Sequence, residues 1–164
     1  FLNGFPQPDR RFHFRADWAA FGPDHTRLPS LPDFADIIDE TSEDRPFRLV
    51  TAPSRNYLNT SFTETATSIR NEARPTVMLN PADCERLGLV AGDRTRLGND
   101  RGSLVVHAEP FEGVKPGIAI VESIWPNAAF EEGIGINLLT SADPGLPNGG
   151  AVFHDTAIWV RPAN

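Results

Sequence analysis

The chain has 164 residues, a formal net charge of −7, 40% hydrophobic residues and one cysteine, Cys84. Its eleven Phe residues can furnish the core of one ordinary domain, which excludes global disorder. The acidic balance argues against a nucleic-acid partner, and no apolar run approaches the roughly 20 residues of a membrane span.

The first 45 residues are expected to form an irregular arm, followed by a domain at 46–164. Each proline removes an amide donor and restrains its predecessor, and prolines interrupt every candidate element at positions 6, 8, 23, 29, 32 and 46. Only "RRFHFRADW" alternates well enough to predict a short strand, with Phe12 and Phe14 on one side and His13 on the other. Because the arm begins at Phe1 without a secretory pattern, we expect a piece of a longer protein.

From residue 47 the pattern is that of a β domain. Short strands are predicted at "FRLVTA", "TVML", "PGIAIVES" and "DTAIWVRP", with a hairpin across "AGDRTRLGNDRGSLVVHAEP". One short helix is predicted at 81–87, because Asn80 is a good N-cap, Pro81 fits the first position and Gly88 supplies a left-handed end. Short strands with one short helix and long loops indicate a closed or nearly closed β-barrel.

Most enzyme signatures are missing from this sequence. The four histidines are scattered, with no pair at metal-ligand spacing on a helix. There is no nucleophile elbow and no P-loop. Cys84 lies within the predicted helix on its core-facing side, so we expect it to pack as a small hydrophobe.

Three loops carry the polar side chains that could bind a ligand. The loop at 51–65 presents Ser54, Arg55 and Asn56, and its alternative is a polar surface loop with Tyr57, Leu58 and Phe62 packed on the barrel. The second, at 122–137, contains Trp125, which in isolation indicates a core residue. The third, "NLLTSADPGLPNGGAVFHD", begins at Asn137, whose amide suits the mixed donor and acceptor edges of a guanine or a pterin. Backbone amides of a glycine-rich loop can also bind a pyrophosphate.

These segments, taken in order, resemble a known family. "RPFRLVTAPSRNYLNTSF", "NPADCERLGLVAGDRTRLGNDRGSLVVHA", "PGIAIVESIWPN" and "GINLLTSADPGLPNGGAVFHDTAIWV" are similar to the C-terminal dinucleotide-binding domain of molybdopterin oxidoreductases, the dimethyl-sulfoxide-reductase superfamily. The resemblance covers about residues 45 to 162. The arm sequence "FPQPDRRFHFRADW" also resembles the segment that precedes this domain, although Asp9 and Arg10 stand where the family has a glycine region.

The resemblance implies a mainly β fold, a six-stranded double-psi barrel with short helices after the irregular arm at 1–45. Such a barrel contacts and covers a molybdopterin guanine dinucleotide, present twice in the full enzyme. Molybdenum or tungsten is then held by other domains of the same oxidoreductase. An N-terminal part of that enzyme can carry an iron–sulfur cluster, and the enzyme can bind an electron-transfer partner. The resemblance therefore implies part of an enzyme, with this piece inactive alone. We expect it in the cytoplasm, with the periplasm as the alternative.

By motif position, the resemblance implies that cofactor contacts come from all three loops. They are Thr51, Ser54, Arg55, Asn56, Trp125, Asn137 and His154. His154 stands where many members of the family have Lys, and no catalytic or metal-binding residue is expected in this chain. Two alternatives are a non-enzymatic double-psi barrel that binds a partner or substrate, and a self-cleaving pyruvoyl enzyme. The second is disfavoured, because its required Gly-Ser pair would be Gly102-Ser103, which has no expected role in the predicted hairpin.

Overall fold

The computed structural model describes residues 2–15, 17–22, 30–31, 39–122, 124–142, 144–145, 150–154 and 156–163. The chain divides into two compact units, Phe1–Ile37 with Asp143–Ala151, and Ile38–Ala142 with Val152–Asn164. In the first unit, a short 3-10 helix, η1, spans Trp18–Phe21, and the two-residue strands β6 (Pro144–Gly145) and β7 (Gly150–Ala151) pair antiparallel. The second unit is called the barrel unit here.

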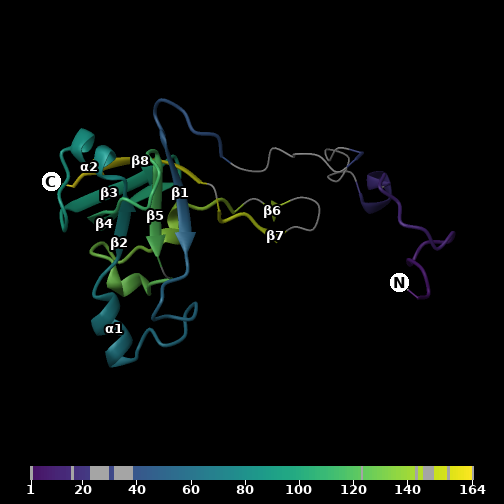
Figure 1. The fold of residues 1–164 in the computed structure, drawn as a ribbon, viewed down its shortest axis with the longest axis horizontal. Coiled ribbons are helices and arrows are strands. Elements are labelled where there is room, and N and C mark those ends of the chain that lie inside the picture. Colours follow the sequence, from purple (N-terminus) through teal and green to yellow (C-terminus); the bar gives the residue numbers. More distant parts are fainter. Residues whose placement is uncertain are drawn as a thin grey trace. The chain divides into compact units, whose positions relative to one another are not determined.

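Six strands of the barrel unit close into a barrel (Figure 1). They are β1 (Phe47–Ala52), β2 (Thr76–Leu79), β3 (Arg94–Asn99), β4 (Gly102–Pro110), β5 (Ile118–Glu122) and β8 (Thr156–Pro162). The order around the barrel is β1-β5-β2-β4-β3-β8. The pairs β1–β5 and β2–β4 are parallel and the other four are antiparallel. The predicted mainly β fold with a six-stranded barrel and short helices is confirmed.

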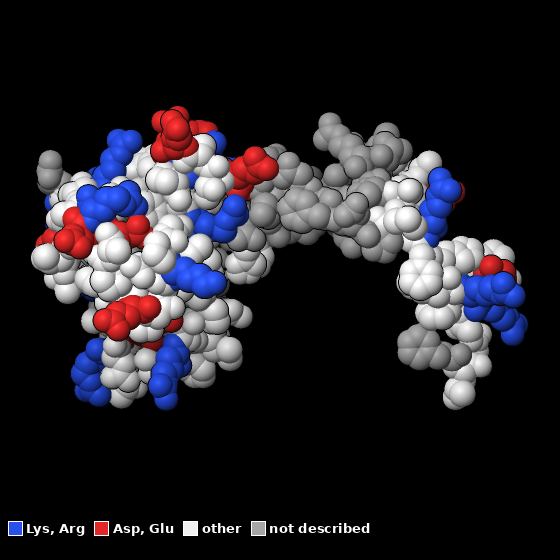
Figure 2. Space-filling view, turned by 45° about the horizontal axis from the view of Figure 1, so that its top comes forward, with Lys and Arg blue, Asp and Glu red and all other residues white. Residues whose placement is uncertain are grey.

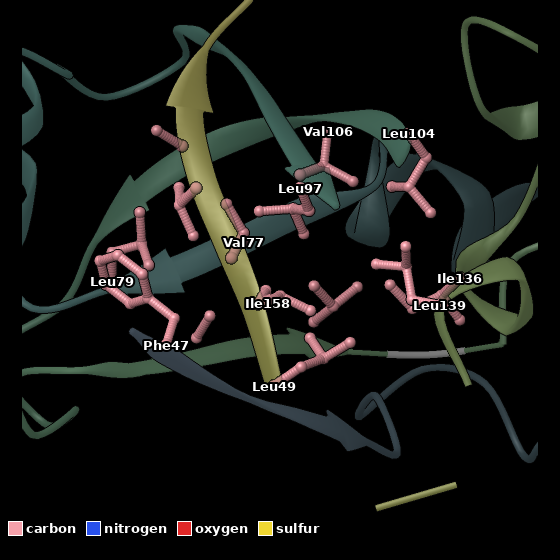
Figure 3. Packing of buried hydrophobic residues seen from close by; sticks show 14 of the residues in the cluster. Phe47, Leu49, Val77, Leu79, Leu97, Leu104, Val106, Ile136, Leu139 and Ile158 are labelled. Carbon is pink, nitrogen blue, oxygen red and sulfur yellow. The ribbon is translucent and has the colours of Figure 1, made fainter. Parts of the chain in front are cut away.

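The barrel interior is filled by alternate residues of these strands (Figure 3). The predicted hairpin is confirmed by its register, in which Leu97 faces Leu104 and Thr95 faces Val106. All four of these side chains are fully buried, as the period of two along each strand requires. Burial of an aliphatic side chain of this size contributes about 1.5–3 kcal/mol, so the hairpin is a principal support of the barrel.

Helix α2 (Pro81–Leu87) ends where the local signals predicted. The side chain of Asn80 accepts a hydrogen bond from the backbone N–H of Ala82 at 2.9 Å, and Gly88 has the left-handed φ of 68°. The buried carboxylate of Asp83 adds a long-range tie, because its Oδ2 accepts from the backbone N–H of Gly117 at 2.7 Å. The helix is therefore fixed both by its caps and by the turn before β5.

Cys84 lies on the buried side of α2, as predicted. Burial raises the pKa of its thiol, and the neighbouring negative charge of Asp83 raises that pKa further. Since the thiolate is the reactive form, we expect iodoacetamide at neutral pH to leave Cys84 unmodified in the folded chain. Mass spectrometry should detect alkylation once urea unfolds the chain, and equal rates in both states would contradict the buried placement.

The strand expected in the first 45 residues was wrong, and one helix of the barrel unit was not located from the sequence. No strand forms in the described part of "RRFHFRADW", where the imidazole of His13 instead contacts the carboxylate of Asp9 at 2.9 Å. The rings of Phe12 and Phe14 do lie together, with centroids 4.8 Å apart. A second helix, α1 (Ala66–Glu72), was not expected, and it is as long as α2. Its residues are all partly or fully exposed and its N-cap makes no side-chain hydrogen bond, so neither periodicity nor a capping signal marked it.

Candidate functional site

The polar loops gather at one end of the barrel. Because β1 and β5 run parallel, with Ala52 beside Glu122, the segments that follow them leave from the same end. The antiparallel pairings of β8 with β1 and β3 bring the start of β8 and the β3–β4 turn to that end as well. Figure 1 shows the arrowheads of β1 and β5 pointing toward α1, with α2 at the opposite end. The starts of the first two loops, the start of β8 and the β3–β4 turn thus lie at the same end of the barrel.

The first loop presents hydroxyl and guanidinium groups. The hydroxyl of Thr51 donates to the carbonyl oxygen of Phe153 at 3.3 Å, which joins the end of β1 to the residue before His154. Ser54 is buried, and its Oγ accepts from the backbone N–H of Tyr57 at 3.1 Å. Arg55 is exposed and makes no hydrogen bond or ion pair to the part of the chain that the structure describes. Both hydroxyls and the guanidinium keep capacity for a ligand.

Asn56 is engaged within the chain. Its backbone N–H and its Nδ2 both donate to Oε1 of Glu72, at 2.9 and 2.7 Å. Its Oδ1 accepts from Nδ2 of Asn71 at 3.3 Å. Glu72 and Asn71 belong to or adjoin the C-terminal turn of α1, so the unexpected helix holds this loop. The contact between Asn56 and Glu72 could not be predicted from the sequence, because a separation of 16 residues gives no local signal.

The apolar residues of the first loop divide into buried and exposed members. Tyr57 is buried, and its ring meets that of Trp125 edge to face, with centroids 5.2 Å apart. Trp125 is itself part of the buried core, as the alternative for this residue expected. Leu58 and Phe62 are 65% and 59% exposed, so the alternative of a loop packed on the barrel by all three residues holds for Tyr57 alone. The Tyr57–Trp125 contact connects the first loop to the second.

Two arginines of β3 form ion pairs with two glutamates of the second loop. Arg94 donates to both carboxylate oxygens of Glu131, at 2.7 and 2.9 Å to Oε2 and 3.2 Å to Oε1. Arg96 pairs with both oxygens of Glu132 and also donates to Oγ of Ser103 at 3.1 Å. These hydrogen bonds lower the pKa values of the Glu131 and Glu132 carboxyls. The long connection after β5 is therefore anchored to the barrel wall.

Asn137 lies in a single 3-10 turn, η4 (Ile136–Leu139). Ile136 and Leu139 are buried, whereas Asn137 is exposed. The backbone oxygen of Asn137 accepts from the N–H of Thr140 at 3.2 Å and from its hydroxyl at 2.9 Å. Its side-chain amide makes no hydrogen bond to any described residue. The fold therefore fixes the backbone of Asn137 while leaving one amide donor group and one acceptor open.

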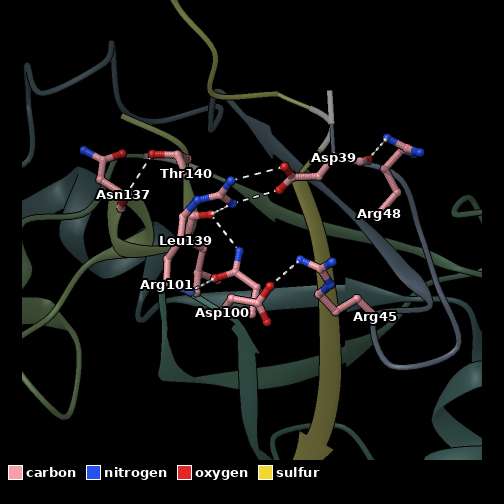
Figure 4. A network of polar contacts seen from close by, with 9 residues as sticks. Asp39, Arg45, Arg48, Asp100, Arg101, Asn137, Leu139 and Thr140 are labelled. Carbon is pink, nitrogen blue, oxygen red and sulfur yellow. Dashed lines mark hydrogen bonds and ion pairs between the residues drawn. The ribbon is translucent and has the colours of Figure 1, made fainter. Parts of the chain in front are cut away.

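A polar network beside this turn holds it in place (Figure 4). Nδ2 of Asn99 donates to the carbonyl oxygen of Leu139 at 2.8 Å, and the guanidinium of Arg101 donates to the same oxygen at 3.2 Å. Arg101 also forms a two-pronged ion pair with Asp39. This hydrogen bonding lowers the pKa of the Asp39 carboxyl. Neither Asn99 nor Arg101 was identified from the sequence.

The remaining candidate, His154, is exposed. Its imidazole contacts the ring of Phe153, with centroids 4.4 Å apart, and has no hydrogen-bond partner among the residues described. Asp143 and residues 146–149 of the third loop lie outside the described residues, so the predicted turn at Asp143 is not covered. Across the face shown in Figure 2, acidic and basic side chains of the barrel unit are interspersed.

In the ranges given above, no group of three or more His, Cys, Asp or Glu side chains could hold a metal ion. No helix among the described residues has the length and apolar character needed to cross a membrane.

Comparison with known proteins identifies the class to which this fold and loop arrangement belong. The profile of the family described as "molydopterin dinucleotide binding domain" matches residues 47–157. The match covers the whole barrel up to the start of β8. The chain belongs to this family of cofactor-binding domains.

Curated relatives agree with that family, and one solved structure shares the fold. The chain is 30% identical over 134 residues to "Probable oxidoreductase YoaE" of Bacillus subtilis, covering 82% of this chain and 19% of the relative. It is 26% identical to "Dimethyl sulfoxide reductase DmsA" of Escherichia coli, covering 79% and 16%. The structure is similar to acetylene hydratase from Pelobacter acetylenicus, with a TM-score of 0.77 at 14% identity over 98% of this chain and 24% of the other. The chain thus spans under a fifth of the length of these curated relatives.

Proposed function

We propose that this chain is the domain of a molybdenum or tungsten oxidoreductase that contacts and covers a molybdopterin guanine dinucleotide. The observation that carries the proposal is the open amide of Asn137 on a turn whose backbone is fixed. Guanine and pterin edges alternate donors and acceptors, and one amide can satisfy both. The family match at residues 47–157 supports a dinucleotide of this kind.

The residues at this end of the barrel fit such a group. The amide of Asn137 would bind a pterin or guanine edge, and Arg55 would balance charge on the pyrophosphate. The hydroxyls of Thr51 and Ser54 retain hydrogen-bonding capacity beyond their contacts within the chain, and His154 would approach a polar group of the cofactor. When bound, the group supplies two-electron redox chemistry at its metal. The residues of this chain bind it, orient it and exclude water.

Asn56 and Trp125 act on the cofactor less directly in this proposal. The amide of Asn56 is shared between Glu72 and Asn71, so it shapes the loop that carries Ser54 and Arg55. Trp125 packs under the same loop through Tyr57. Exposed Leu58 and Phe62 offer apolar contacts to the remaining domains of the enzyme, which supports a domain of a longer protein over a free-standing binding module.

Hydrogen exchange in the full-length enzyme tests this function. The enzyme is purified from a host that makes the cofactor and from one that cannot, and exchange is measured by mass spectrometry. We expect the cofactor to slow exchange in peptides from 51–65 and 136–154. Peptides from 80–93, which contain α2 at the opposite end of the barrel, serve as the control and should not change.

Chemical analysis of the two preparations completes the test. Acid treatment of the loaded enzyme should release guanine nucleotide, and elemental analysis should distinguish molybdenum from tungsten. Equal exchange of the loop peptides in loaded and cofactor-free enzyme would contradict the proposal.

A further inference from the structure

Three segments that are distant in the sequence meet at the guanidinium of Arg101 (Figure 4). Nη1 donates to Oδ2 of Asp39 at 2.8 Å and to the carbonyl oxygen of Leu139 at 3.2 Å, and Nη2 donates to Oδ1 of Asp39 at 3.1 Å. Asp39 precedes β1, Arg101 lies in the β3–β4 turn, and Leu139 ends η4. One side chain therefore connects the segment before the barrel to the turn that carries Asn137.

Each end of this connection is braced by a second contact. The backbone oxygen of Asp39 accepts from Nη1 of Arg48 at 3.3 Å, which fixes Asp39 to β1. The Oδ1 of Asn99 accepts from the backbone N–H of Arg101 at 2.9 Å, while its Nδ2 donates to the carbonyl oxygen of Leu139. The β3–β4 turn and η4 thus form one hydrogen-bonded assembly.

The turn η4 depends on such outside contacts. Its own backbone bonds are of the i to i+3 type, from Leu138 to Gly135 and from Thr140 to Asn137, and a 3-10 turn of this length is weak by itself. A binding group must be held to within about 0.5 Å by its supporting residues to keep its hydrogen bonds. Asn137 lies two residues before the carbonyl that Arg101 holds, so displacement of that carbonyl displaces the amide.

We propose that Arg101 is a positioning residue, which uses Asp39 as its anchor to hold the Asn137 amide in place for the dinucleotide. This inference rests on the proposed function, because it takes Asn137 as the cofactor contact. It adds that the segment before β1 controls the retention of the cofactor. A change in the position of Asp39 is passed through one guanidinium to the carbonyl of Leu139.

The test compares two ion pairs in the full-length enzyme. Asp39→Ala removes the anchor of Arg101. Asp100→Ala is the control, because Arg45 and Asp100 join the same two segments at 3.0 Å and neither forms a hydrogen bond or ion pair with residues 136–140. Asp100 is more exposed than Asp39, so thermal midpoints are recorded for both. Arg101→Lys keeps the charge but loses the planar fork that serves two acceptors at once.

Two readouts are taken from every variant. The first is hydrogen exchange of peptides containing residues 138–140 in cofactor-free enzyme, and the second is the amount of guanine nucleotide retained after dilution of loaded enzyme. For Asp39→Ala and Arg101→Lys we expect faster exchange and a loss in retention of about fivefold, the net effect of one typical hydrogen bond. Asp39→Glu, which retains a carboxylate, should restore part of both, and Asp100→Ala should match the wild type.

The two readouts separate failure of this inference from failure of the proposed function. Wild-type exchange at 138–140 in Asp39→Ala would overturn the role of Arg101, whatever the cofactor does. Faster exchange with unchanged retention would also overturn it. In that case an Asn137→Leu variant is measured in parallel. Lowered retention of the nucleotide in this variant would leave the proposed function standing, and normal retention would contradict both the role of Arg101 and the proposed function.

Discussion

Replacing Leu139 with alanine is expected to lower the free energy of unfolding of the chain by about 2–5 kcal/mol. The side chain of Leu139 is fully buried in the core cluster, so truncation loses apolar burial and leaves a cavity. The backbone oxygen that accepts from Asn99 and Arg101 is kept in this variant. Urea unfolding monitored by circular dichroism gives the measurement.

The adjacent leucine provides a matched control. Leu138 lies in the same turn but is only half-buried, and it packs over Gly102, where an added Cβ would lie 2.6 Å from its Cδ2. Leu138→Ala should therefore cost clearly less than Leu139→Ala. Equal losses would mean that η4 is stabilised by its surface contacts and not by the barrel core.

Replacing Asn137 with leucine in the full-length enzyme is expected to reduce retention of the dinucleotide by roughly one to two decades. Buried donors and acceptors of the cofactor would lose their partner, which costs about 1–3 kcal/mol. The thermal midpoint of the cofactor-free enzyme should hardly change, because the amide makes no hydrogen bond within the described structure. Nucleotide content is measured on loaded enzyme and the midpoint on cofactor-free enzyme, since a bound ligand itself raises the midpoint.

A second substitution distinguishes the donor group of the Asn137 amide from its acceptor oxygen as the contact to the cofactor. Asn137→Asp keeps an acceptor and removes the donor group, so intermediate retention would indicate that the donor is used. A large drop in midpoint with normal retention in Asn137→Leu would make Asn137 a structural turn residue. The polar loop would then be a connection and not a binding surface.

The parts of the fold that were predicted correctly have local causes. Asn80 and Gly88 mark the ends of α2 because capping depends on residues within one turn of each other. Thr95 and Leu97 were correctly predicted to point into the barrel, because the alternation of inward and outward residues can be recognised along a single strand. The strand expected around Phe12 did not form, since a strand also needs a partner edge, which alternation alone does not provide.

The contacts that shape the candidate site could not be predicted in this way. Arg94 meets Glu131 across 37 residues, and Arg101 meets Asp39 across 62. Charge and spacing in one sequence do not indicate which arginine pairs with which carboxylate. The choice of Asn137 came from its amide chemistry and from the family resemblance, and its role in cofactor binding stays a prediction.

The pairing of β1 has a consequence for synthesis of the protein. Its neighbours are β5 and β8, and Phe47 of β1 pairs with Ile158 of β8. The barrel therefore cannot close until Ile158 has been synthesised. A ribosome that adds about 5–20 residues per second needs roughly 5 to 20 s for the intervening stretch. The edge of β1 that pairs with β8 is unpaired throughout that interval, and the other edge is unpaired until β5 has been made. An open strand edge invites aggregation. A chaperone that recognises extended apolar segments would therefore act on the nascent chain between the emergence of β1 and the completion of β8.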